Sequence, residues 1–244
     1  MKWKVFCLSI SLLGLFQISF AQEKNEFEEL LLLFVDEEYE KCLRKAEKYT
    51  LDKETRREPM PYLYIAMCML EISKIEEADE LYPRAFKDAL SYTYRYVKKD
   101  RDMLYYDDHA DFFARLRQEA MLRAENEMAE ESYSRAKYFY RGLARIDEKD
   151  PSALFMQAYT ELLSKAGRDA AVNFEQAMRL YNEYDSMYSL TEEQRELMRY
   201  GFLTYADYLI QEGRSDSAYA TLEHGKRLFL DDETFMKGYQ KLKQ

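Results

Sequence analysis

Apolar and polar residues alternate with a helical period of about 3.6 along nearly all of the chain after residue 26. Within this pattern an apolar quartet recurs, whose successive members are 3, 1 and 3 residues apart. Residues at this spacing share one stripe of a helix, so each quartet predicts an amphipathic helix of about four turns. The quartets are Phe27/Leu30/Leu31/Phe34, Tyr62/Ile65/Ala66/Met69, Phe155/Ala158/Tyr159/Leu162 and Phe202/Tyr205/Ala206/Leu209.

A second stripe follows each quartet and opens with a small residue 15 or 16 positions after the quartet begins. Its members are 4 and 3 residues apart, which again predicts a helix. A fifth second stripe follows a weaker first helix that carries Met121, Ala124 and Met128. The second stripes are Cys42/Ala46/Tyr49, Ala78/Tyr82/Ala85, Ala136/Tyr140/Leu143, Ala170/Phe174/Ala177 and Ala218/Leu222/Gly225.

This order of aromatic, apolar and small residues resembles the tetratricopeptide repeat, a helix–turn–helix unit of 34 residues. The resemblance covers about residues 27–229, and the best single copy is 199–229. It implies an all-α fold, a solenoid of about five helix–turn–helix units within a single domain, 22–244. A helical bundle with accidental spacing is the alternative. The expected repeats are about 26–50, 60–82, 108–146, 151–181 and 191–229.

Two departures from the family period predict irregular joints. The small positions that open the second helices are separated by 36, 58, 34 and 48 residues. The spacing of 58 predicts an extra helix, 83–99, that begins at Pro83, because proline suits a first helical position. The spacing of 48 predicts an extended connection after Tyr181 that ends at a capping box, Thr191 to Gln194. A terminal helix, 232–243, is expected to cap the last repeat.

The first 21 residues have the features of a secretory signal peptide. Lys2 and Lys4 precede a mostly apolar stretch, and small residues at Ser19 and Ala21 predict cleavage after Ala21. A membrane anchor is the alternative, although the stretch is short for a span of about 20 residues. The signal followed by Gln22 resembles those of Bacteroidota periplasmic proteins. We therefore expect an exported protein, periplasmic or secreted, with no stable membrane insertion.

Composition agrees with a helical, exported chain. Only 7 Gly and 4 Pro occur among 244 residues, which leaves little turn chemistry for a many-stranded sheet protein. The net charge is −10, or −12 once residues 1–21 and their two lysines are removed. An acidic chain whose sequence shows no basic patch is a poor candidate for binding nucleic acid or anionic lipid. The 22 Tyr and 14 Phe fill many of the large positions of the stripes.

Residue patterns for catalysis, metals and cofactors are missing from the sequence. His109 and His224 are far apart and have no partner at ligand spacing. No phosphate-cradling glycine loop, dinucleotide fingerprint or nucleophile elbow occurs. We therefore predict no enzymatic activity, no metal and no cofactor. The only support for an enzyme is an aromatic cluster in the segment 83–110. We interpret this cluster as an aromatic packing surface and not as a catalytic site. Its members are Tyr92, Tyr94, Tyr96, Tyr105, Tyr106 and His109.

Export permits a disulfide between the two cysteines that remain after cleavage, Cys42 and Cys68. Cys42, however, occupies a small-residue packing position, and Cys68 lies between Met67 and Met69. We predict two buried free thiols.

The resemblance to the repeat family implies a concave face lined by the first helices, at positions offset from the packing quartets. That face lacks the Lys and Asn with which family members hold a peptide carboxylate; Leu31 and Leu203 occupy comparable places. An apolar groove that accepts a partner helix or extended segment is the expectation, because Met adapts to varied surfaces. Its predicted lining is Met60, Leu63, Met67, Leu70, Met156, Thr160, Leu163, Tyr200, Leu203, Asp207 and Ile210.

The expected function is therefore a non-enzymatic scaffold that binds a protein or peptide partner in the bacterial periplasm or cell envelope. The alternative is a self-assembling structural envelope protein, a homo-oligomer. For the groove there is an equally good alternative: it is filled by the protein's own helix 83–99 or by a second copy of the chain.

Overall fold

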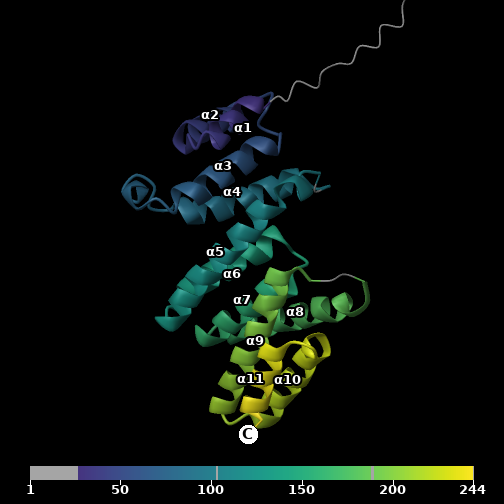
Figure 1. Cartoon of the computed structure of the whole chain (residues 1–244). Coiled ribbons are helices and arrows are strands. Elements are labelled where there is room, and N and C mark those ends of the chain that lie inside the picture. The colour runs from purple at the N-terminus through teal and green to yellow at the C-terminus, as the bar shows by residue number, and fades with distance from the viewer. Residues whose placement is uncertain (1–26, 103, 188–189, 244) are drawn as a thin grey trace, which may run out of the picture.

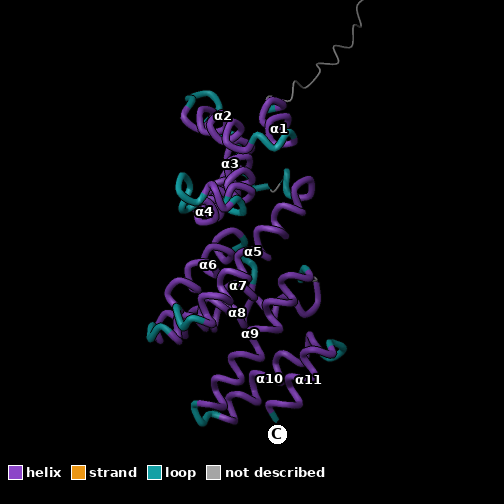
Figure 2. Tube along the Cα trace, turned by 60° about the vertical axis from the view of Figure 1, so that its left-hand side comes forward, coloured by secondary structure: helices purple, strands orange, loops and turns teal. Residues whose placement is uncertain are grey.

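The computed structural model describes residues 27–102, 104–187 and 190–243, and within them it is helical without strands, as predicted (Figures 1 and 2). The predicted signal peptide lies outside the described residues. The α-helices are α1 Glu28–Val35, α2 Tyr39–Leu51, α3 Met60–Ile72, α4 Ala85–Lys99, α5 Ala110–Ala129, α6 Tyr133–Ile146, α7 Pro151–Leu163, α8 Gly167–Met187, α9 Glu192–Gln211, α10 Ser215–Phe229 and α11 Glu233–Leu242.

Helices that follow each other in the chain pack in pairs, and the pairs succeed one another along an elongated molecule (Figure 1). The pairs are α1 with α2, α3 with α4, α5 with α6, α7 with α8, and α9 with α10. Helix α2 also packs on α3, and α6 packs on α7, so neighbouring pairs share an interface. Apart from Leu31, the residues of the apolar stripes are buried or half-buried.

Four of the five pairs are joined by the same tight turn. Each turn contains one residue with a left-handed backbone: Glu37 (φ 59°), Glu131 (φ 56°), Lys165 (φ 62°) and Gly213 (φ 73°). The amide of the following residue donates to the carbonyl five positions earlier, as Arg214 does to Leu209 over 2.8 Å, which closes the helix end. The small residue that opens the next helix lies five positions after the left-handed one in every case: Cys42, Ala136, Ala170 and Ala218.

The second pair departs from this pattern and corrects the prediction. Lys74 follows the Ser73 cap of α3 but lacks the positive φ of the equivalent residues in the other turns, so the tight turn does not form. Ala78 therefore lies in a short 3-10 helix, Glu76–Ala78, and the predicted helix with the stripe Ala78/Tyr82/Ala85 is absent. Helix α4 begins at Ala85 and packs against α3 in its place. The segment 83–99 is thus the second helix of this pair and not an extra one.

The second predicted joint also differs from the expectation. Helix α8 continues to Met187, where the sequence predicted an extended connection after Tyr181. The predicted capping box is confirmed: the Thr191 hydroxyl accepts from the Gln194 amide over 3.3 Å, and the Gln194 side chain accepts from the Thr191 amide over 3.0 Å. From this start α9 packs mainly on α7 and α10.

Two helices form the centre of the packing. Helix α3 is surrounded by α1, α2 and α4, and α7 by α6, α8 and α9, so nearly all of their side chains are buried. Aromatic rings fill the space around α7: the Phe155 ring lies 5.0 Å from Phe174, 5.2 Å from Phe202 and 5.8 Å from Tyr205. The Tyr and Phe excess is therefore largely structural.

The C-terminal end is closed by α11, as predicted. The Asp232 carboxylate caps this helix by accepting from the Phe235 amide over 2.8 Å, and it pairs with Arg199 of α9 over 2.7 Å. Gly225 of α10 lets α11 approach, because a Cβ there would lie 2.7 Å from the Phe235 ring. The apolar end of the last pair is thus covered.

The loop between α6 and α7 is a polar joint, residues 147–150, that connects several helices. Asp150 caps α7 by accepting from the Ser152 amide over 2.9 Å, and its other oxygen lies 2.5 Å from Arg117 of α5. Asp150 is fully buried, so this ion pair is shielded from water. Asp147 accepts from Gln194 of α9 over 3.1 Å; burial, followed by the charge of Asp150, raises the pKa of Asp147.

Asp150→Asn should destabilise the protein by about 3 kcal/mol, because the amide can still cap α7 but leaves the mostly buried Arg117 charge unpaired. Chemical denaturation measures this change in the free energy of unfolding. Glu148→Gln is the matched control: its partner Lys98 and Glu148 itself are both exposed, so the loss should be below about 1 kcal/mol. Equal losses for the two variants would contradict the central position of the buried pair.

Gly213→Ala should destabilise the protein by about 1 kcal/mol, because the left-handed backbone is unfavourable for a residue with a Cβ. Gly167→Ala is the control: an added Cβ meets no neighbouring atom at either position, but only Gly213 has a positive φ. Urea denaturation should show no loss for Gly167→Ala, and a gain of up to about 1 kcal/mol from helix propensity. A loss for both variants would show that backbone conformation is not the cause.

Candidate functional site

The structure buries much of the groove lining that the sequence predicted. Leu63 and Met156 are fully buried, Met67 is 8% exposed, and Thr160 is fully buried with its hydroxyl donating to the Met156 carbonyl over 3.0 Å. Leu70 is fully buried as well. These side chains are core residues of α3 and α7, because other helices surround both. Their assignment to an open groove is wrong for this structure.

The other predicted residues remain partly accessible but are dispersed. Met60 lies at the start of α3, whereas Tyr200, Leu203 and Asp207 belong to α9, in the lower half of Figure 1. Leu203 is half-buried against α11, since a Cβ on Gly238 would lie 2.7 Å from its methyl carbon. Asp207 is exposed and accepts from Gln211 over 2.7 Å. Leu163 and Ile210 are half-buried.

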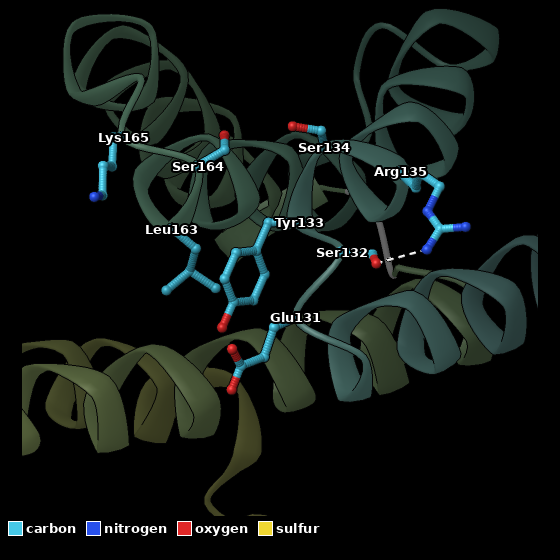
Figure 3. Close-up of a pocket in the computed structure, with 8 residues that line it drawn as sticks. All are labelled: Glu131, Ser132, Tyr133, Ser134, Arg135, Leu163, Ser164 and Lys165. Carbon is cyan, nitrogen blue, oxygen red and sulfur yellow. Dashed lines mark hydrogen bonds between the residues drawn. The ribbon is translucent and has the colours of Figure 1, made fainter.

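A surface hollow of about 420 Å³ lies between the turns α5–α6 and α7–α8. In Figure 3 the Tyr133 ring extends between Leu163 and Glu131, whereas the Lys165 side chain points away. Arg135 is engaged with the Ser132 hydroxyl over 2.7 Å and with Glu127 over 2.9 Å. The serine hydroxyls of the lining have no histidine or cysteine beside them.

Cys42 and Cys68 are both buried and free, which confirms that prediction. The Cys42 thiol donates to the Leu30 carbonyl over 3.4 Å, and Cys68 lies beside it. The hydrogen bond with Cys42 and burial raise the pKa of Cys68, so this thiol stays protonated at neutral pH and is a poor nucleophile. The pair fills the contact between α2 and α3.

The aromatic cluster of 83–110 does not form one site. Tyr96 is fully buried and donates to Asp100 over 2.5 Å, and Tyr106 stacks on Phe113 with ring centres 4.6 Å apart. Tyr94 lies on another face of α4, beside Arg145 of α6. His109 Nδ1 is 2.9 Å from the Tyr105 carbonyl. In the described parts of the chain no group of His, Cys, Asp and Glu side chains is placed to hold a metal ion.

Two like charges meet where α5 and α9 cross. Burial, followed by the charge of Glu196, raises the pKa of Glu125. The Tyr140 hydroxyl nearby is buried without a hydrogen-bond partner, and the pKa of Tyr140 is raised by burial and by Tyr200 and Glu125. The surroundings of Glu125 and Tyr140 therefore disfavour a negative charge on either side chain.

An exposed apolar face on α1 is the feature that the sequence interpretation missed. Helix α1 has only eight residues instead of about four turns, and Leu30 is its one fully buried side chain. Leu31 was predicted to pack but is 41% exposed; Leu32 and Val35 are 58% and 67% exposed. The run of four leucines, residues 30–33, was the available signal, because consecutive apolar residues make more than one helix face apolar. Among the described residues, the α1 face, Leu31, Leu32 and Val35, is thus an exposed apolar surface.

The fold and these surfaces define an all-α protein made of packed helix pairs. Comparisons with protein-family models, with curated proteins and with solved structures give no match, so the resemblance to the tetratricopeptide repeat is supported by the residues alone. None of the helices in the described ranges is both long enough and apolar enough to cross a bilayer.

Glu125→Gln should raise the free energy of unfolding at pH 7, by at most about 1 kcal/mol because Glu125 is partly exposed. A raised folded-state pKa means that the stability contribution of Glu125 is fully present below its unfolded pKa and is lost as pH rises through the folded value. The gain should therefore disappear in acid, as urea denaturation against pH would show. Glu196→Gln should give part of the same gain, and a gain independent of pH would contradict this explanation.

Proposed function

We propose that this chain is a non-enzymatic protein–protein interaction module of the tetratricopeptide-like class, acting as a scaffold in the bacterial periplasm or cell envelope after export. The observation that carries the proposal is the exposed α1 face at one end of the packed pairs. The repeated turns, each followed five residues later by a small packing residue, support the likeness to the repeat family.

The two ends of the helix array differ. Arrays of stacked repeats need a terminal unit with a polar outer surface, because stacking otherwise leaves apolar side chains in water. At the C-terminal end α11 provides this cover. At the N-terminal end α1 presents Leu31, Leu32 and Val35. After the predicted cleavage only residues 22–26 would precede it, and their sequence, Gln-Glu-Lys-Asn-Glu, is polar.

The partner that fits is an amphipathic helix of another protein. Leu31, Leu32 and Val35 lie at positions i, i+1 and i+4, which share one side of a helix and match the apolar stripe of a second helix. Such a helix would stack on α1 as a further member of the array. A heterologous partner is favoured over a second copy because the strong negative net charge makes copies repel each other.

The test is site-specific photo-crosslinking from position 32 in the native envelope, compared with position 230, where Leu230 is equally exposed at 59%. Crosslinking from position 32 alone to a different protein, with a concentration-independent monomer by light scattering, is the expected result. Crosslinks between copies would support the self-assembling alternative.

Leu32→Glu/Val35→Glu should abolish this capture and leave helicity by circular dichroism unchanged, because both side chains are exposed. Leu81→Glu/Leu230→Glu places the same charges at two other exposed leucines and should retain capture. Equal loss in both double variants would attribute the effect to charge rather than to the α1 face.

A further inference from the structure

A narrow cleft lies between α4 and α6, and its lining is basic and tyrosine-rich. Its volume is about 30 Å³. Leu90 and Gly142 contribute to its wall, and a Cβ on Gly142 would lie 3.1 Å from the Leu90 methyl carbon, so the glycine lets the two helices approach. The polar lining is Ser91, Tyr94, Tyr138, Arg141 and Arg145. We call these five residues the basic cleft.

Basic side chains lie beside the rings of both tyrosines of the basic cleft. The Arg145 guanidinium carbon is 4.0 Å from the centre of the Tyr94 ring, and Lys98 Nζ is 5.4 Å from it. Lys87 Nζ lies 5.4 Å from the centre of the Tyr138 ring. The Arg145 hydrogen bond, with the charge of Lys98, lowers the pKa of Tyr94. The local field is therefore positive.

Most of these cations lack an acidic partner. Within the described residues Lys87, Arg141 and Arg145 form no ion pair with a carboxylate, whereas Lys98 pairs with Glu148 over 3.1 Å. Helix α6 carries four basic residues and no acidic one, in a chain of net charge −10. Unpaired cations concentrated on an acidic protein are complementary to an anionic ligand.

We propose that the basic cleft binds carboxylate side chains of an acidic polypeptide segment. The guanidinium groups of Arg141 and Arg145 match the planar geometry of a carboxylate, and the tyrosine and serine hydroxyls can donate as well. The volume of about 30 Å³ is small, which suits a single small group better than a continuous polyanion. Long phosphate polymers would also meet the acidic remainder of the surface.

The basic cleft is separate from the α1 face. The proposal that it binds carboxylates does not depend on the proposed scaffold function. Both surfaces can act on one partner or on two. A variant of the α1 face, Leu32→Glu/Val35→Glu, should therefore bind an acidic peptide as the unmodified protein does.

The test uses a fluorescent peptide of alternating glutamate and serine, with glutamine replacing glutamate in the control peptide. Fluorescence anisotropy at low ionic strength should show binding of the glutamate peptide, at least about tenfold tighter than of the glutamine peptide. Added salt should weaken it, because exposed charges are screened.

Arg141→Gln/Arg145→Gln should weaken peptide binding about tenfold or more, because it removes both guanidinium groups. Arg141→Lys/Arg145→Lys should bind with intermediate affinity, since charge remains but bidentate geometry is lost. The charge-matched control is Arg179→Gln/Arg214→Gln: both residues are exposed and lie outside α4 and α6, so affinity should stay within about twofold. Circular dichroism and thermal unfolding should be unchanged in all of them.

Equal weakening by Arg141→Gln/Arg145→Gln and by the control pair would overturn the proposal, as would absence of binding to the glutamate peptide. Tighter competition by single-stranded DNA, or by vesicles containing phosphatidylglycerol, would assign the basic cleft to a polyphosphate or a membrane surface instead. If light scattering showed dimers that Arg141→Gln/Arg145→Gln converts to monomers, the occupant would be a second copy and the proposal would fail.

Discussion

The buried pair of Arg117 with Asp150 connects α5 to the start of α7, in the middle of the helix array. Asp150 fixes the start of α7, and the Arg117 charge holds that start against α5. The same loop reaches α9 through Asp147 and Gln194. A buried charge pair is costly to break, because one ion is then left without a partner or water. Helices α5, α7 and α9 are therefore linked through this joint.

The repeated tight turn is the second constraint, and it acts on each helix pair by itself. A left-handed residue ends the first helix, and a small residue five positions later lets the second helix pack closely. Where Lys74 lacks this left-handed backbone, the connection lengthens and α4 starts late. Three of the four left-handed residues are not glycine, so local backbone preference alone did not mark these turns.

The two surfaces that we propose for recognition differ in chemistry. The α1 face is apolar and belongs to the first described helix, whereas the basic cleft is charged and lies between α4 and α6. The predicted concave groove was not found among the residues assigned to it, because Leu63, Met156 and Thr160 are surrounded by neighbouring helices. An offset from the packing stripe does not imply exposure when a helix is enclosed on every side.

The all-α class, most helix positions, the capping box at Thr191 and the burial of both thiols could be predicted from the sequence. These features depend on periodicity and short-range chemistry, which local residues specify. Which helix faces stay exposed, in contrast, depends on how the helices pack in three dimensions. Arg141 and Arg145 of α6 line the same cleft as Tyr94 of α4, although about fifty residues separate them in the chain. The fold therefore forms a basic patch that the negative net charge of the chain did not predict. The exposure of a side chain and the electrostatic potential around it depend on all residues that are close in space. The sequence alone does not show which residues these are.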